Sequence, residues 1–261
     1  MGTYSPPVDK LLTLGRPDLA DDGPDFAAFG IGPEHVPDLI RLLQDKELIQ
    51  IPETEDDPPQ WYAHIHAWRA LGQLRAPEAI GPLLDLLGEN ADAEDWSDWI
   101  MEELPEVLGK FGPRLIPLIV ERMDQKKGEY RNTQFADVLV EIGKRHPEAR
   151  GEVIRQLCRV LESADTNDPA LNGFIMSDLI DLKAIEAWPE IERAFATGHV
   201  DESIAGDIND VKYRLGLGPK PAPRFPVLAG PPRAGTNAKQ RFNERQRKKK
   251  LEKKKNKKKG K

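Results

Sequence analysis

The sequence of 261 residues contains a single cysteine, Cys158. No disulfide can form within the chain, which fits a reducing compartment and excludes the small disulfide-stabilised folds. Cys158 lies in the apolar pattern of residues 151–161 and is expected to be a small core residue. A catalytic thiol would need a basic partner, and the sequence identifies none.

Long apolar runs are missing as well. No stretch approaches the ~20 apolar residues that a membrane-spanning helix needs. The N-terminus lacks the charged region and the apolar region of a secretory signal. A myristoylation motif is disfavoured, because Pro6 stands where that motif has Ser or Thr. We therefore expect a cytoplasmic protein.

Motifs for catalysis and cofactor binding are also absent. There is no nucleophile elbow, no P-loop and no dinucleotide fingerprint. His64 and His66 form an H-x-H pair, but side chains two apart on a helix project in nearly opposite directions and cannot readily share a metal ion. Carboxylates are plentiful, yet no apolar pocket is defined that would shift their pKa values. We predict no enzymatic activity, no cofactor and no metal site.

What the sequence does contain is a repeat. Four segments with a shared apolar spacing begin at Pro33, Pro77, Pro113 and Pro147, and a fifth begins at Ile185. These starts are 44, 36, 34 and 38 residues apart. A period of this size is typical of helical hairpin repeats.

A second helix precedes each of the later repeat starts. These helices are predicted over residues 61–74, 98–111, 135–146 and 173–184. Gly72, Gly109 and Gly143 occupy equivalent places in the first three, which suits a helix end or a close helix crossing. The proline that follows opens the next helix, where its missing N–H is harmless. A second proline, Pro37 or Pro117, predicts a late helix start or an irregular first turn in two of the units.

Apolar periodicity indicates which face of these helices is buried. One stripe of the helix over 61–74 is apolar, comprising Trp61, Ile65, Trp68 and Gly72, and His66, Arg69 and Gln73 lie off it. A single hairpin cannot cover such a stripe, so neighbouring hairpins must stack. No run has the alternation of a half-buried strand. The sequence predicts an all-α fold.

The pattern L-G-x-L-x-x-P-E-A-I-x-x-L-x-x-L within residues 71–87 resembles the short HEAT repeats of the phycobilisome-lyase type. The resemblance covers about residues 30–215 and is strongest over 61–123. It implies a right-handed α-solenoid of about five HEAT-like helical hairpins with a concave face that binds a partner. It implies little about chemistry, because unrelated proteins use such repeats.

Composition divides the chain into four parts. Residues 1–30 are predicted to be an irregular segment, and residues 31–215 the repeat domain, which ends in one helix over 201–215. Residues 216–238 are rich in proline and glycine and read as an extended linker. Residues 239–261 have too few apolar side chains to support a core and are predicted to be a disordered basic tail.

Charge is divided as sharply as composition. The tail has eleven lysines, three arginines and two glutamates, a net of +12; since the whole chain carries −6, residues 1–238 carry −18. Such a tail favours attachment to RNA or ribonucleoprotein without sequence preference. In a nucleated cell it would also favour nuclear import. The cations are Lys239, Arg241, Arg245, Arg247, Lys248, Lys249, Lys250, Lys253, Lys254, Lys255, Lys257, Lys258, Lys259 and Lys261.

Acidic loops recur in the body at 53–59, 89–95 and 162–169. We expect each to connect the second helix of one unit to the first helix of the next, which would align them as an acidic rim along one edge. The rim could receive a protein partner, or the chain's own tail. A simpler interpretation is that acidic residues favour helix starts while the tryptophans pack inward. The candidate rim residues are Asp56, Asp57, Asp92, Glu94, Asp95, Trp96 and Trp99.

Together these features predict a non-enzymatic adaptor or scaffold, in which the solenoid holds an unknown protein partner and the tail attaches to RNA. One alternative, suggested by the repeat type, is a lyase or lyase subunit that attaches phycobilin-type pigments, although no catalytic residue can be carried over to this chain. Another is a structural protein whose tail only aids solubility. The oligomeric state stays open.

Overall fold

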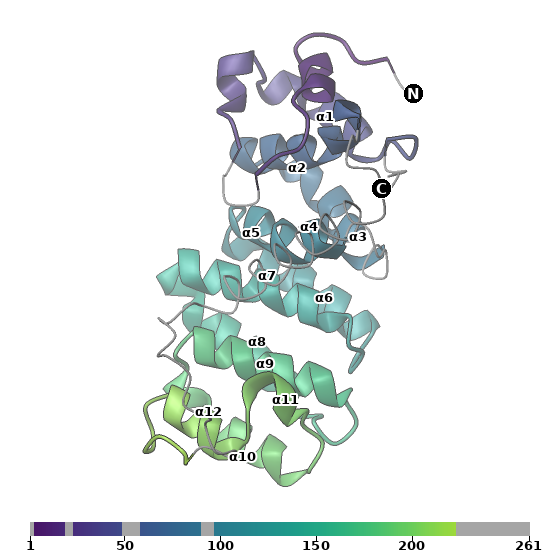
Figure 1. Cartoon of the computed structure of the whole chain (residues 1–261). Helices are drawn as coiled ribbons and strands as arrows, with labels where there is room; N and C mark the ends of the chain where they lie inside the picture. The colour runs from purple at the N-terminus through teal and green to yellow at the C-terminus, as the bar shows by residue number, and fades with distance from the viewer. Residues whose placement is uncertain (1–2, 19–22, 49–57, 90–96, 223–261) are drawn as a thin grey trace, which may run out of the picture. The chain divides into compact units, whose positions relative to one another are not determined.

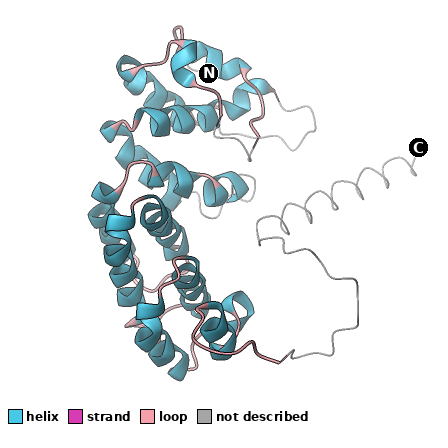
Figure 2. Cartoon of the chain, turned by 90° about the vertical axis from the view of Figure 1, so that its left-hand side faces the viewer, coloured by secondary structure: helices cyan, strands magenta, loops and turns pink. Residues whose placement is uncertain are grey.

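The computed structural model describes residues 3–18, 23–48, 58–89 and 97–222. Within these ranges the chain forms helices, turns and loops and no strand (Figure 2). This confirms the predicted all-α class. Contacts divide the chain into two units, Met1–Lys220 and Pro221–Lys261. The predicted tail and residues 223–238 of the predicted linker lie outside the described residues.

Two layers of helices build the first unit, and they alternate along the chain (Figure 1). The first layer consists of α1 (Val36–Leu43), α3 (Ile80–Glu89), α6 (Ile116–Gln125), α8 (Arg150–Leu161) and α10 (Trp188–Ala196). The second consists of α2 (Ala63–Leu74), α4 (Ser97–Glu102), α5 (Leu104–Gly109), α7 (Asn132–Arg145), α9 (Pro169–Asp181), α11 (Glu202–Ala205) and α12 (Ile208–Arg214). The described residues thus form five helical hairpins, as predicted.

The hairpins stack through the second layer. There α2 packs on α5, α5 on α7, α7 on α9, and α9 on α11 and α12. The first four hairpins also close on themselves, since α1 packs on α2, α3 on α5, α6 on α7 and α8 on α9. The apolar side chains meet between the layers in one continuous core that includes Trp68, Leu83 and Leu139, all fully buried. Stacking is what covers the apolar stripe of each helix, because one hairpin alone would leave half of it in water.

Every first-layer helix begins with a single 3-10 turn. These turns are η3 (Pro33–His35), η5 (Pro77–Ala79), η6 (Pro113–Leu115), η7 (Pro147–Ala149) and η8 (Ile185–Ala187). The late, irregular start predicted from Pro37 and Pro117 is therefore confirmed, since both prolines lie in the first turn of the α-helix that follows. The same turn occurs in units without a second proline, so that proline accommodates the turn and does not cause it.

Glycines mark close crossings between successive second-layer helices. A Cβ atom at Gly72 would lie 2.6 Å from Val107 Cγ1, and one at Gly109 would lie 2.8 Å from the Cβ of Glu141. A Cβ at Gly143 would lie 3.2 Å from Leu182 Cδ2. The close crossing predicted for these glycines is therefore confirmed, and Gly109 also has the other predicted role, since it is the last residue of α5.

Two predicted helices are broken in the structure. The helix expected over 98–111 is interrupted at Glu103, between α4 and α5, because Pro105 has no N–H to continue the helical hydrogen bonds. The helix expected over 201–215 divides into α11 and α12. Gly206 has a φ of +92° there, and the Asp207 carboxylate accepts hydrogen bonds from the backbone N–H groups of Asn209 and Asp210 to begin a new helix.

The N-terminal residues are part of the core of this unit. Two further 3-10 helices form there, η1 (Val8–Thr13) and η2 (Phe26–Phe29), and η1 packs on α2. Val8, Leu11 and Phe26 are at most 1% exposed. Residues predicted to be merely irregular therefore cover the start of the stack, as a capping element must in a repeat array.

Candidate functional site

The polar stripe of α2 is covered by the N-terminal segment. His66 and Arg69, predicted to lie off the apolar stripe, are only 3% and 2% exposed, and Gln73 is exposed. The three residues are three and four positions apart, so they form one line along the helix. We define the N-terminal segment as residues 15–26, of which 19–22 lie outside the described residues.

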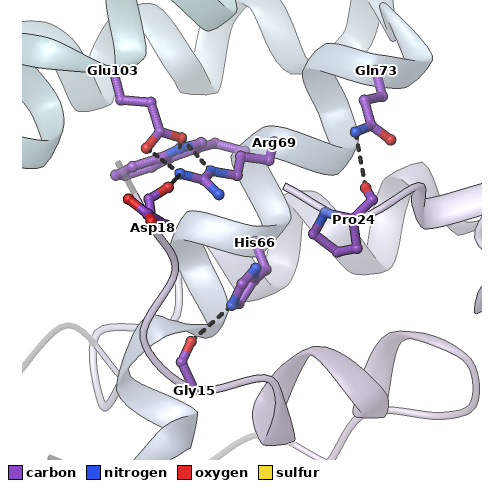
Figure 3. A network of polar contacts seen from close by, with 8 residues as sticks. Gly15, Asp18, Pro24, His66, Arg69, Gln73 and Glu103 are labelled. Carbon is purple, nitrogen blue, oxygen red and sulfur yellow. Dashed lines mark hydrogen bonds and ion pairs between the residues drawn. The ribbon is translucent and has the colours of Figure 1, made fainter. Parts of the chain in front are cut away.

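This line of side chains binds the main chain of the N-terminal segment (Figure 3). His66 Nε2 lies 2.9 Å from the carbonyl oxygen of Gly15, and Arg69 Nη2 donates to the carbonyl oxygen of Asp18 at 2.9 Å. Gln73 Nε2 donates to the carbonyl oxygen of Pro24 at 3.0 Å, and its Oε1 accepts from the N–H of Phe26. The helix thus binds a segment of polypeptide through backbone groups of that segment.

Arg69 is held for this task by a buried ion pair. Its Nε and Nη2 donate to the two carboxylate oxygens of Glu103 at 2.6 and 2.7 Å, and Trp68 Nε1 donates to Glu103 Oε1 at 2.8 Å (Figure 3). Two parallel bonds of this kind fix the plane of the guanidinium group. The break between α4 and α5 is what places Glu103 opposite α2.

The H-x-H pair does not assemble a metal site. His64 packs edge-on against the Trp68 ring, with 5.6 Å between ring centroids, whereas His66 packs against Phe26 at 6.3 Å. Burial lowers the pKa of both histidines below the ordinary value. Across the part of the chain that the structure describes, no three His, Cys, Asp or Glu residues are grouped to hold a metal ion.

A second polar cluster lies between α7 and α9. We define the carboxylate cluster as Asp137 and Glu141 on α7 and Asp178 and Asp181 on α9. Lys144 Nζ lies 3.2 Å from Glu141 Oε1 and 3.9 Å from Asp181 Oδ2. Sequence reasoning missed this cluster, because its two halves are about 40 residues apart. The signal was the acidic pairs at helical spacing in two adjacent second helices.

Burial governs the electrostatics of this cluster. It raises the pKa of Asp137 to about 7; Lys144 opposes the rise, and Glu141 and Asp181 add to it. Asp178 is 7% exposed, and burial together with the nearby Asp137 raises its pKa well above the ordinary value. Asp178 Oδ2 accepts no hydrogen bond from any described residue. Both carboxyl groups are therefore easier to bury in the protonated form than in the ionised form.

The predicted acidic rim is mostly outside the described residues. This applies to Asp56, Asp57, Asp92, Glu94, Asp95 and Trp96. Trp99 lies in α4 and is only 8% exposed, so its ring offers almost no surface to a partner and packs inward, as the simpler interpretation states.

Of the three acidic loops, only residues 162–168 are described throughout. They join α8 to α9, the two helices of one hairpin, and not two successive units as predicted. Asp168 accepts a hydrogen bond from the N–H of Ala170 at 2.8 Å and caps α9.

Two further candidate features are Cys158 and a polar cavity. Cys158 is half-buried against the core. Burial, aided by Glu190 and Glu186, raises its pKa to about 11, which favours the unreactive thiol.

A polar cavity of about 210 Å³ between α6 and α8 is bounded by Asn132, Asn167 and Arg159. The Asn132 and Asn167 amides donate to carbonyl oxygens around it, so they serve the fold.

Among the described helices, none is both long and apolar enough to cross a membrane. No curated protein and no solved structure matches the chain. A family model described as "Protein of unknown function (DUF1186)" matches residues 32–218, a range that takes in all five hairpins. The chain therefore belongs to the DUF1186 family.

Proposed function

We propose that the chain is a non-enzymatic, cytoplasmic adaptor, a HEAT-like solenoid whose second helix layer binds a protein partner. One observation carries this proposal: α2 already binds the backbone of another segment, the chain's own N-terminal segment, through His66, Arg69 and Gln73. A surface that recognises backbone groups can hold different sequences, because every peptide offers the same carbonyl oxygens.

The arrangement of the second layer supports the same role. Since α2, α5, α7 and α9 pack side by side, a polypeptide lying across them can contact several repeats at once. Charged groups are available along this layer, from Arg69 on α2 to the carboxylate cluster on α7 and α9. An extended partner that binds in this way buries a large surface, so each single contact can be weak.

The basic tail is the second part of the proposal. Its fourteen cations would attach the adaptor to RNA or a ribonucleoprotein surface by neutralising phosphates, with an affinity that falls with salt. The solenoid would then determine which protein partner binds, and the tail would hold the adaptor on the RNA or ribonucleoprotein.

Site-specific photo-crosslinking tests the protein-binding role. A photoreactive side chain is placed at Gln73 or Lys144, both exposed on the second layer, or at Leu118, which is 41% exposed on the first-layer helix α6. We expect crosslinks to a partner protein in host-cell extract from the two second-layer positions and none from Leu118. Crosslinks from Leu118 alone, or from no position, would contradict the proposal.

A further inference from the structure

The polar cavity between α6 and α8 lies where two successive hairpins meet, and we call it the junction cavity. Its walls include Gly128 from the α6–α7 turn and Asn167 from the α8–α9 loop. The N–H of Asp168 donates to the carbonyl oxygen of Gly128 at 2.9 Å. Gly128 has a φ of +80°, and a Cβ there would lie 3.1 Å from Asn167 Oδ1. The two loops therefore touch directly beside the cavity.

Two buried asparagines of the wall have acceptors that the fold does not use. Asn132 and Asn167 are 3% and 2% exposed. Asn132 Nδ2 donates to the carbonyl oxygens of Met123 and Lys126 at 3.1 and 2.9 Å, and Asn167 Nδ2 donates to that of Val160 at 2.8 Å and to a further asparagine side chain. Neither Oδ1 accepts a hydrogen bond from any described residue. Because an unpaired buried acceptor is costly, these oxygens need a donor inside the cavity.

Charged side chains of both signs also line the junction cavity. Arg159 donates to the two carboxylate oxygens of Asp124 at 3.0 and 3.1 Å, so these two charges neutralise each other. Lys127 and Glu162 are exposed and make no hydrogen bond or ion pair with any residue in the described ranges. The described lining thus offers one free ammonium group and one free carboxylate, and its net charge is zero.

Size and donor pattern limit what the junction cavity can hold. Its volume of about 210 Å³ is below the roughly 300–1,000 Å³ of pockets for drug-sized ligands, which leaves room only for a small molecule. The two asparagine oxygens need N–H or O–H donors, and an ammonium group has three of them. A carboxylate on the same molecule would pair with Lys127 through a charge-assisted hydrogen bond. A ligand with both charges fits a lining without net charge.

We propose that the junction cavity binds a small zwitterionic amino acid. Its ammonium group would donate to the Oδ1 atoms of Asn132 and Asn167 and to Glu162, and its carboxylate would accept from Lys127. This site is separate from α2 and does not rest on the proposed adaptor function. Since its walls come from two hairpins, a bound amino acid would join them and stabilise the folded chain in proportion to its occupancy.

Nuclear magnetic resonance titration of the full chain tests this site. The probes are glycine and L-alanine at pH 7.5, each with an analogue that lacks the carboxylate (methylamine, ethylamine) and one that lacks the amine (acetate, propionate). We expect glycine or alanine to shift backbone amides within 123–132 and 159–168, together with the side-chain amide resonances of Asn132 and Asn167. Each analogue should bind at least ten-fold more weakly, because it loses the hydrogen bonds of one charged group.

Substitutions then locate the binding. Lys127→Gln and Glu162→Gln should each weaken binding about three- to ten-fold, as loss of one charged hydrogen bond at an exposed position does. Lys126→Gln and Glu129→Gln are the matched controls, because both residues are exposed and neither lines the cavity. Each control should change binding less than about two-fold. All four side chains are exposed, so the variants should keep the fold.

Three results would overturn the proposal. Absence of shifts with both amino acids at millimolar concentration would show that the cavity holds only water. Analogues that bind as well as their parent amino acid would show that one charge suffices, and the site would then not recognise a zwitterion. An equal loss in Lys127→Gln and Lys126→Gln, or in Glu162→Gln and Glu129→Gln, would place the binding elsewhere on the surface.

Discussion

Burial acts in opposite directions on the ionisable residues of this chain. On α2 it lowers the pKa of His64 and His66, because a buried imidazole is cheaper in its neutral form. On α7 and α9 it raises the pKa of Asp137 and Asp178, because a buried carboxyl group is cheaper when protonated. The histidines then favour folding at high pH and the carboxyl groups favour it at low pH.

The Asp178→Asn substitution should separate these two effects. In the wild-type chain Asp137, with a pKa of about 7, stays protonated when folded and ionises when unfolded. Its contribution to stability is complete below the ordinary Asp pKa and is lost as pH rises through about 7. Asp178→Asn removes a buried carboxyl group whose own pKa is raised well above the ordinary value, so one of the groups that favour folding at low pH is lost, and the free energy of unfolding should fall less steeply as pH rises above about 4.

Urea unfolding at several pH values measures that slope. Asp165→Asn, on an exposed loop, is the matched control and should leave the slope as in the wild type. His64→Gln should change the pH dependence of stability at low pH instead. The contribution of His64 to stability is present above the ordinary His pKa and is lost as pH falls below it. An Asp178→Asn slope equal to that of the wild type would show that burial does not raise the pKa of Asp178.

Among the elements, prolines and glycines were the signals that sequence reasoning could use. The prolines at 33, 77, 113 and 147 mark the start of four of the five first-layer units, and the Leu-Gly and Ile-Gly pairs mark the crossings. Such signals work because they are local: they act through a missing N–H or a missing Cβ. The break at Glu103 was also readable, since Pro105 lies two residues beyond it.

The candidate site was much less predictable. The N-terminal segment is bound through the carbonyl oxygens of Gly15, Asp18 and Pro24, and a backbone contact leaves no mark on side-chain sequence. Lys144 reaches Asp181 only because α7 packs on α9, and hairpins of unequal length hide which residues of successive units lie opposite each other. Both features depend on tertiary packing.

The crossing at Gly109 gives a prediction with a matched control. A methyl group there would lie 2.8 Å from the Cβ of Glu141, so Gly109→Ala should force α5 and α7 apart and lower stability by about 1–3 kcal/mol. Gly81→Ala in α3 meets nothing within 4 Å and should raise stability by about 0.5–1 kcal/mol through helix propensity. Thermal unfolding followed by circular dichroism compares them; a shift of the same sign in both variants would exclude a tight crossing.

In the molecule as a whole, the concentrated positive charge and the described hydrophobic core lie in different parts of the sequence. The described hydrophobic core runs from Val8 to Leu215, and residues 239–261 add only Phe242 and Leu251 as large apolar side chains. A net charge of +12 on that segment, beside −18 on the rest, concentrates attraction for phosphates in a segment that is poor in large apolar side chains.

A chain ending at Lys220 should therefore keep the melting temperature of the full chain and lose its affinity for RNA. Gel-shift titration with an unstructured RNA measures the affinity between 50 and 200 mM salt. If the full chain neutralises six or more phosphates, its affinity should fall about a thousand-fold over that range, whereas the shorter chain should bind weakly at both. Equal migration of RNA with the two chains would show that the tail does not bind RNA, and would favour a solubilising role for it.

A lower melting temperature for the shorter chain, seen only at low salt, would instead show that the tail binds its own acidic body, because such a contact is screened by ions.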